Sequence, residues 1–259
     1  MSILNQSRLW RLRRKLSQAL APSNDSLAEA DDYNWSLYTG EYRSEIRSVG
    51  RDNTLLFQKG DLILSDHQLV PTTGDIRPHP NHLLLYETLV LLNPATILEA
   101  GCGAGDHLAN LSTLLPNSVL FGVDRSPEQL DFLRERHPNP RFSTSVVDLS
   151  LPFPHQTQTV DVAFTQAVIM HMQTGNSHRV ALANLFRIAE RQVILMENWQ
   201  RHSFVSDIRH LRELGIIGWR DLYLYRREIA TQQGQAKLLV ASSVEVPFED
   251  LRSDDDLRV

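Results

Sequence analysis

The stretch Glu99-Ala100-Gly101-Cys102-Gly103-Ala104-Gly105-Asp106 places three glycines at alternate positions directly after an apolar run, Ala95–Ala100. The run has the length and composition of a buried strand, and Leu108, Leu111 and Leu115 follow it at helical spacing. The glycine stretch is therefore predicted to be a loop between a strand and a helix. Glycines there let a ligand approach the backbone closely, and the free N–H groups of the helix N-terminus suit an anionic ligand group.

Strand-type runs continue along the rest of the chain. They are Val119–Val123, Arg141–Val147, Val160–Phe164, Gln192–Met196, Asp221–Tyr225 and Ala236–Ala241. Helical patterns lie between most of them. Strands that alternate with helices at this rhythm predict an α/β fold with a mostly parallel sheet of about seven strands and helices on both faces. In such sheets ligands bind beyond the carboxyl ends of the strands, at the point where the strand order reverses.

Three helices are predicted from their own signals. Ser126-Pro127 has the form of a helix cap followed by proline at the first turn, and Gln129 occupies the capping-box position. A second helix is marked by the apolar face of Leu182, Leu185, Phe186 and Ala189, and a third is predicted around Ser206–Leu214.

The spacing of the glycines indicates which ligand the loop serves. A dinucleotide-binding fingerprint, G-x-G-x-x-G, would need a glycine where Asp106 stands, whereas the third glycine here is Gly105. Glu99 lies two positions before Gly101. This pattern resembles the first motif of class I S-adenosylmethionine-dependent methyltransferases. The resemblance implies a Rossmann-like methyltransferase fold with S-adenosyl-L-methionine as cofactor, and it disfavours a nicotinamide-dependent oxidoreductase.

The resemblance continues in order over roughly residues 80 to 243. Gly122-Val123-Asp124 matches the second motif, Val147-Asp148-Leu149 the third and Asp161-Val162-Ala163-Phe164 the fourth. In the family the first of these acids accepts hydrogen bonds from both ribose hydroxyls, since a carboxylate offers two acceptors to two donors. The second acid binds the adenine amino group. Taken singly, each motif also has a purely structural interpretation as a turn, a cap or a loop acid.

The cofactor site implied by the resemblance comprises Glu99, Gly101, Cys102, Gly103, Gly105, Asp124, Arg125, Asp148, Leu149 and Gln166. Cys102 is interpreted as a small loop residue and not as a nucleophile. Asp106 has two interpretations, as a partner of the cofactor's ammonium group or as an acid of the helix's first turn.

The acceptor side is predicted to lie after the fourth and fifth strands. A methyltransferase mainly aligns the acceptor and removes its proton, so His171 and Glu197 are the predicted catalytic residues, with Asn198 and His202 near them. His171 has an alternative role as a ring hydrogen-bonded to backbone beside the cofactor. Glu197-Asn198 is similar to the Asp-Asn pair of magnesium-dependent catechol-type O-methyltransferases. Thr165-Gln166 stands where those enzymes place another acid, and no metal is predicted.

The absence of two known motifs narrows the class of methyl acceptor. The Asn/Asp-Pro-Pro-aromatic motif of base-amino methyltransferases is replaced by Thr165-Gln166-Ala167-Val168, and no paired-glutamate loop of the protein-arginine type is present. We expect methylation of O or N on a small-molecule, sugar or lipid-linked acceptor. A non-catalytic S-adenosylmethionine-binding protein is the main alternative.

Composition sets the broader expectations. The chain has 259 residues, 42% hydrophobic and 22% charged, with a formal charge of −5, so nucleic acid is not an expected partner. Its single cysteine excludes an intrachain disulfide, and no run reaches the roughly 18 to 20 apolar residues of a membrane helix. A cytoplasmic location is expected, and the oligomeric state is left open.

The predicted domain organisation has four parts: a basic segment 1–30, an extension or lid 31–80, the methyltransferase domain 81–245 and an acidic tail 246–259. Residues 1 to 24 contain five basic residues and no acidic one. They fit a transit peptide, a helix whose residues 1–20 lie on an anionic membrane, or a helix packed on the domain. Tyr33, Trp35, Tyr38 and Tyr42 either roof the active site or pack onto the domain, and His79 and His82 are further candidates to reach the substrate.

Overall fold

The computed structural model of the chain describes residues 39–40, 43, 55–153, 159–173, 175–231 and 234–251. Contacts divide the chain into two compact units, Met1–Asn34 and Trp35–Val259, and every described residue belongs to the second. The predicted basic segment and the aromatic cluster of residues 33 to 42 fall outside the described residues, except for Thr39 and Gly40.

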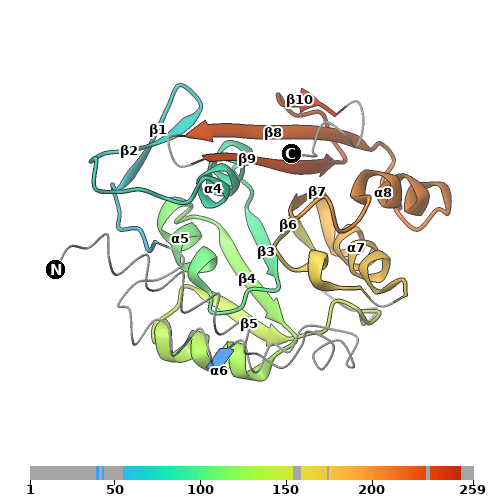
Figure 1. The fold of residues 1–259 in the computed structure, drawn as a ribbon, viewed down its shortest axis with the longest axis horizontal. Coiled ribbons are helices and arrows are strands. Elements are labelled where there is room, and N and C mark those ends of the chain that lie inside the picture. Colours follow the sequence, from blue (N-terminus) through green and yellow to red (C-terminus); the bar gives the residue numbers. More distant parts are fainter. Residues whose placement is uncertain are drawn as a thin grey trace, which may run out of the picture. The chain divides into compact units, whose positions relative to one another are not determined.

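An eight-stranded sheet forms the centre of this unit, in the order β10-β8-β9-β7-β6-β3-β4-β5 (Figure 1). Its parallel strands are β3 (Thr96–Ala100), β4 (Val119–Asp124), β5 (Phe142–Val146), β6 (Val160–Gln166) and β7 (Ala189–Met196). Antiparallel pairing adds β9 (Gly234–Ser242), β8 (Tyr223–Thr231) and β10 (Glu249–Asp250) beyond β7. The predicted α/β fold with a mostly parallel sheet is confirmed.

Helices cover both faces of the sheet. The first face carries α4 (Pro80–Leu92), α5 (Asp106–Leu114) and α6 (Pro127–Arg136), and the second carries α7 (Ser177–Ile188) and α8 (Phe204–Glu213) (Figure 1). Alternate side chains of one strand enter the two cores, as their opposite directions in a strand require. In β7, Ile194 packs in the first core, and Val193 and Leu195 pack in the second.

Helix α4 is buried along most of its length. Every side chain from Leu83 to Leu89 is buried, because the helix packs on β8 and β9, on the hairpin β1–β2 (Leu62–Ser65 and Gln68–Pro71) and on α5. Buried Glu87 accepts a hydrogen bond from the backbone N–H of Leu69 (2.9 Å) and forms an ion pair with Arg227 of β8. The hairpin and the last strands of the sheet are thus joined through one helix.

The chain reverses its direction across the sheet at β3. Strands β4 and β5 lie on one side of it, and β6 and β7 lie on the other. The loops that follow β3 and β6 therefore leave in opposite directions at the carboxyl edge, which is where a ligand crevice is expected.

Part of the predicted acidic tail belongs to the sheet. Glu249–Asp250, within the predicted acidic tail, pair with β8, and Leu251 is buried. In the part of the chain that the structure describes, no helix combines the length and apolarity that crossing a membrane requires.

Candidate functional site

The glycine loop between β3 and α5 is bound to the neighbouring strand. The N–H groups of Gly101 and Cys102 both donate to the carbonyl of Val123, over 2.7 and 3.0 Å. All three glycines of the motif have positive φ: 81° at Gly101, 49° at Gly103 and 79° at Gly105, the N-cap of α5. L side chains rarely adopt such angles, so the backbone itself explains the glycines.

Close packing adds a second reason for two of these glycines. A Cβ atom at Gly101 would lie 2.4 Å from Val168 Cγ2, and one at Gly105 would lie 2.6 Å from Leu133 Cδ1. At Gly103 the nearest atom to a Cβ would be Gln129 Oε1, at 3.6 Å. The backbone at Gly103 is therefore the part of the loop that a ligand can approach most closely.

Asp124, the last residue of β4, connects this loop to the next helix. Its Oδ2 accepts a hydrogen bond from Gly103 N (2.9 Å), and its Oδ1 accepts one from Ser126 N (2.9 Å). Burial raises the pKa of Asp124, and these bonds and the adjacent, exposed Arg125 partly oppose that rise. Each carboxylate oxygen has two lone pairs, so both oxygens keep capacity for the hydroxyls of a diol.

The cap of α6 differs in one detail from the predicted capping box. Ser126 Oγ accepts the predicted bond from Gln129 N (3.2 Å), and proline begins the helix. The N–H of Ser126 donates to Asp124 and not to the Gln129 side chain, so only half of the box forms.

Glu99 is buried in β3 with an oxygen that has no hydrogen-bond partner among the described residues, Oε2. Burial raises the pKa of Glu99 well above its usual range, and Asp106 and Asp124 add to that rise. An unpaired buried acid is costly unless a donor or a cation meets it. A ligand ammonium group would provide both.

Asp106 is held within the protein. Its Oδ1 lies 2.5 Å from Arg136 Nε and 3.0 Å from His137 Nε2, at the end of α6. Burial alone would raise the pKa of Asp106, but the bonds from His137 and Arg136 outweigh burial and lower the pKa. Of its two predicted roles, the structure supports that of an acid in the first turn of α5.

The loop after β5 carries Asp148 and Leu149. Asp148 Oδ1 accepts hydrogen bonds from the backbone N–H (2.9 Å) and the hydroxyl (2.6 Å) of Ser150, which forms a tight turn. Leu149 is buried in the second core. Asp148 is thereby placed at the same edge of the sheet as Asp124.

Asn184 of α7 fixes this loop and was not predicted. Its Nδ2 donates to the carbonyls of Leu149 (2.9 Å) and Leu151 (2.7 Å), and its Oδ1 accepts from Phe153 N (3.1 Å). The signal available in the sequence was a polar residue on the apolar face of a predicted helix, next to Leu185.

Glu197, a predicted catalytic residue, is buried and contacts backbone. Its Oε1 accepts from Val168 N (3.1 Å) and Ile169 N (3.3 Å), and its Oε2 accepts from Met170 N (3.0 Å). Burial raises the pKa of Glu197, and these bonds oppose that rise. The carboxylate thus holds the short helix η1 (Ile169–His171), which follows β6.

His171, the other predicted catalytic residue, lies in η1 and is half-buried, and its N–H donates to Val168 O (3.1 Å). His202 contacts the same segment, because its ring hydrogen-bonds to the backbone of Ile169 and Met172. His171, Glu197 and His202 are therefore brought together around one segment at the carboxyl edge of β6 and β7.

A polar cluster beneath Gln166 was missed by the sequence analysis. His107 Nδ1 lies 2.7 Å from the Tyr86 hydroxyl, and the Gln166 side chain hydrogen-bonds to the same imidazole. The His82 ring packs on His107 with centroids 4.7 Å apart. Tyr86 also accepts a bond from Asn110 Nδ2 (2.9 Å). Of this cluster only His82 was singled out in the sequence, as a candidate to reach the substrate, and here its ring packs on His107.

Both histidines of this cluster are neutral near pH 7. Burial is the main cause that lowers the pKa of His107 to about 4 and that of His82 to about 2, and the neighbouring imidazoles lower the latter further. Within the described ranges, no three His, Cys, Asp or Glu side chains gather so that they could hold a metal ion.

Residues 97–192 match the family model described as a methyltransferase domain. These residues form a methyltransferase domain. The matched region runs from β3 into β7 and includes the glycine loop, Asp124, Asp148 and Gln166. The family and the fold predicted from the sequence are thereby confirmed. No curated protein matches the chain.

Solved structures resemble the chain at low identity. A TehB-like S-adenosylmethionine-dependent methyltransferase from Corynebacterium glutamicum is 17% identical with a TM-score of 0.51, covering 81% of this chain and 97% of that one. The magnesium protoporphyrin IX methyltransferase of Synechocystis, with bound S-adenosylmethionine, is 16% identical with a TM-score of 0.44, covering 62% and 79%. The plantazolicin methyltransferase BpumL is 14% identical with a TM-score of 0.46, covering 62% and 83%. The first of these shares the fold of the methyltransferase domain.

Proposed function

We propose that this methyltransferase transfers the methyl group of S-adenosylmethionine to an oxygen or nitrogen of a small-molecule, sugar or lipid-linked acceptor. The observation that carries the proposal is the hydrogen bond from Gly103 N to Asp124 Oδ2. It joins the loop after β3 to the acid that ends β4, at the edge where the strand order reverses. That edge is where an open α/β sheet binds its ligand.

The residues at this edge fit the chemically distinct parts of the cofactor. Asp124 suits the ribose diol, and the backbone at Gly103 allows close approach. The unpaired Oε2 of Glu99 suits the ammonium group of the methionine part. Within the described residues both hydrogen bonds of Asp148 go to Oδ1, which leaves Oδ2 for the adenine amino group. The proposed set is completed by Gly101, Cys102, Gly105, Arg125, Leu149 and Gln166.

When bound, S-adenosylmethionine supplies a methyl group on a sulfonium, activated for in-line displacement by the acceptor. The chain's own task is alignment, which is worth on the order of 7–11 kcal/mol in favourable cases. Gln166 ends β6 and η1 follows it at the carboxyl edge, and we expect both to line the acceptor side. His171 is proposed to take the acceptor's proton, because a neutral imidazole is a base near pH 7.

The neutral state of His82 and His107 fits this chemistry. A protonated imidazole beside Gln166 would repel a cationic cofactor, whereas a neutral one hydrogen-bonds without charge. The lowered pKa values of the two rings keep them neutral throughout the physiological range. We assign them to the support of Gln166 and not to proton transfer.

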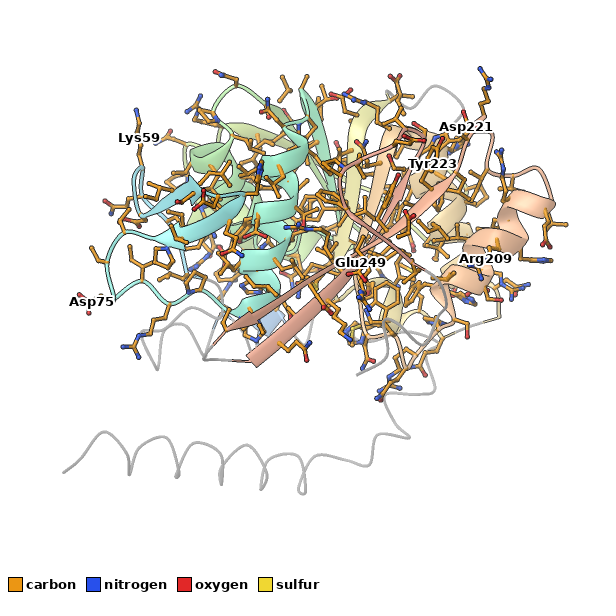
Figure 2. The ribbon with its side chains drawn as sticks, turned by 90° about the horizontal axis from the view of Figure 1, so that it is seen from above. Lys59, Asp75, Arg209, Asp221, Tyr223 and Glu249 are labelled. Atoms are coloured by element: carbon orange, nitrogen blue, oxygen red, sulfur yellow. The ribbon has the colours of Figure 1, made fainter. Side chains whose placement is uncertain are left out.

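The decisive experiment is calorimetric titration of S-adenosylmethionine into the wild type and Asp124→Ala. We expect the substitution to weaken binding ten-fold or more, about 1.4 kcal/mol. Asp75→Ala is the control, since Asp75 is exposed and points away from the domain (Figure 2). Binding of a nicotinamide cofactor in place of S-adenosylmethionine would overturn the proposal. Binding without turnover in an acceptor screen would instead support the non-catalytic alternative.

A further inference from the structure

The segment after β6, residues 167–172, is held from one side by the segment after β7. Three consecutive backbone N–H groups, those of Val168, Ile169 and Met170, converge on the two oxygens of Glu197 over 3.0 to 3.3 Å. His202 hydrogen-bonds to the backbone of the same segment at Ile169 and Met172. The acid thus binds the N–H groups at the start of η1, and the imidazole contacts the backbone of the same segment.

The opposite side of this segment contacts the glycine loop. The Val168 side chain occupies the space next to the Cα of Gly101, where its Cγ2 would lie 2.4 Å from a Cβ. Ala167, the residue before it, has φ +54°, and its N–H donates to Met196 O over 3.0 Å. A left-handed alanine costs roughly 1–2 kcal/mol, so the surrounding contacts must hold the segment in this path.

Glu197 suits the task because of its chemistry. A carboxylate has acceptors only, and three N–H donors meet it here. A glutamine side chain at this position would have an NH2 group in place of one acceptor oxygen, so two donors would face each other there. Charge-assisted bonds from backbone N–H groups are also among the stronger hydrogen bonds, so they fix the segment firmly.

We propose that Glu197 is a positioning residue, which sets the place of η1, presses Val168 against Gly101 and so aligns the acceptor side with the cofactor loop. In this role Glu197 acts through the backbone of Val168, Ile169 and Met170, which its carboxylate binds. This inference rests on the proposed function and replaces the predicted catalytic role of Glu197.

The test compares Glu197→Gln with Glu190→Gln in calorimetric titrations with S-adenosylmethionine and S-adenosylhomocysteine. Glu190 is a matched control, because it lies near the start of β7, the strand that Glu197 follows, and is exposed. We expect at least a ten-fold loss of affinity in Glu197→Gln and less than a two-fold change in the control. Glu197→Asp, which keeps the charge, is expected to recover part of the loss.

Two further measurements separate positioning from a general loss of structure. In amide NMR spectra of Glu197→Gln, we expect the Val168, Ile169 and Met170 signals to move upfield while the Leu98 signal stays. Val168→Ala closes a double-mutant cycle: if Glu197 acts through Val168, the two losses of affinity are less than multiplicative.

The outcomes distinguish the two proposals. Wild type that fails to bind S-adenosylmethionine would overturn the proposed function. Wild type that binds, together with Glu197→Gln that binds equally well or with losses that multiply independently, would overturn the positioning role alone. If Glu197→Gln does not fold, the same comparison is made with Glu197→Asp, for which wild-type affinity and unmoved amide signals would refute the role.

Discussion

Asp106, the first residue of α5, and Arg136, the last residue of α6, form a buried ion pair with 2.5 Å between Oδ1 and Nε. Only 6% of the Asp106 side chain and 10% of the Arg136 side chain are exposed. The pair places a negative charge at one helix N-terminus and a positive charge at another helix C-terminus, so each charge also interacts favourably with its helix dipole. The start of α5 is thereby fixed directly behind Gly105.

Removal of the Asp106 side chain should lower the free energy of unfolding. Asp106→Ala leaves Arg136 buried without its main partner, and breaking a buried pair in this way costs about 3–5 kcal/mol of unfolding free energy. Asp131→Ala is the control, because Asp131 pairs with Arg134 at the surface, with 67% and 59% of the two side chains exposed. Such a pair is worth about 0–1 kcal/mol. Urea unfolding measures the loss of stability in each variant. Equal losses would contradict the structural role assigned to Asp106.

The contact between Gly101 and Val168 predicts that Gly101→Ala is destabilised and loses affinity for S-adenosylmethionine. The left-handed backbone alone costs about 1–2 kcal/mol, and the clash with Val168 adds to that cost. Gly74→Ala is the control, because a Cβ there has nothing within 4 Å and φ is not positive. Thermal unfolding and calorimetry give the two readouts. The double variant Gly101→Ala/Val168→Ala should recover only the part of the lost stability that is due to the clash. A full recovery would show that the left-handed backbone at residue 101 adds no cost.

The buried histidines predict a fall in stability on the acid side of neutrality. Their pKa values are lowered in the folded state, to about 4 for His107 and about 2 for His82, so the unfolded chain binds more protons below pH 6.5. The stability they contribute is present above that pH and is lost as the pH falls toward the folded-state values. Each group adds a slope of up to about 1.4 kcal/mol per pH unit.

Unfolding by urea between pH 5 and 7 measures this slope. We expect His82→Gln to lower the slope, because one of the two groups no longer titrates. His210→Gln, at an exposed position of α8, is the control and should leave the slope unchanged. A wild-type slope that is flat across this range, or one that His82→Gln leaves intact, would show that the cluster is open to water.

The strands were predictable because their signals are local. Strands β3, β4, β6 and β7 each contain a short apolar run with buried residues, which stands out in the sequence without knowledge of its neighbours, whereas the edge strand β5 has no buried residue. β8 was predicted as Asp221–Tyr225 but spans Tyr223–Thr231, because its second half, with Arg226 to Glu228, is polar. That half is stabilised by pairing with β9, which no local pattern records.

Helix α4 shows the converse limit. Its side chains are buried on nearly all sides, so the one-sided periodicity that marks a helix is absent from its sequence. The same helix brings Tyr86 to His107, and this contact was missed with it.

In the site, the residues that the sequence identified are those whose position follows from the ends of parallel strands. The glycine loop and Asp124 come together because β3 and β4 are neighbours. The place of Glu197 at the carboxyl edge of a strand was also predicted, although the predicted role was catalytic. Its partners were not, because they depend on the path of residues 167–172. Asn184 was missed because its contact with Leu149 spans 35 residues of sequence.

The ion pair between Glu87 of α4 and Arg227 of β8 spans 140 residues of sequence. During synthesis, α4 emerges long before β8 and β9, so the surface that buries it does not yet exist and the Glu87 charge has no counterion in its final place. Long-range contacts of this kind slow folding and delay its completion until the end of the chain is available. The region matched by the family model, residues 97–192, contains neither α4 nor the β8–β9 pair. It is therefore a unit of sequence similarity and not a unit of folding, and a fragment cut to its limits would expose the apolar face that α4 covers.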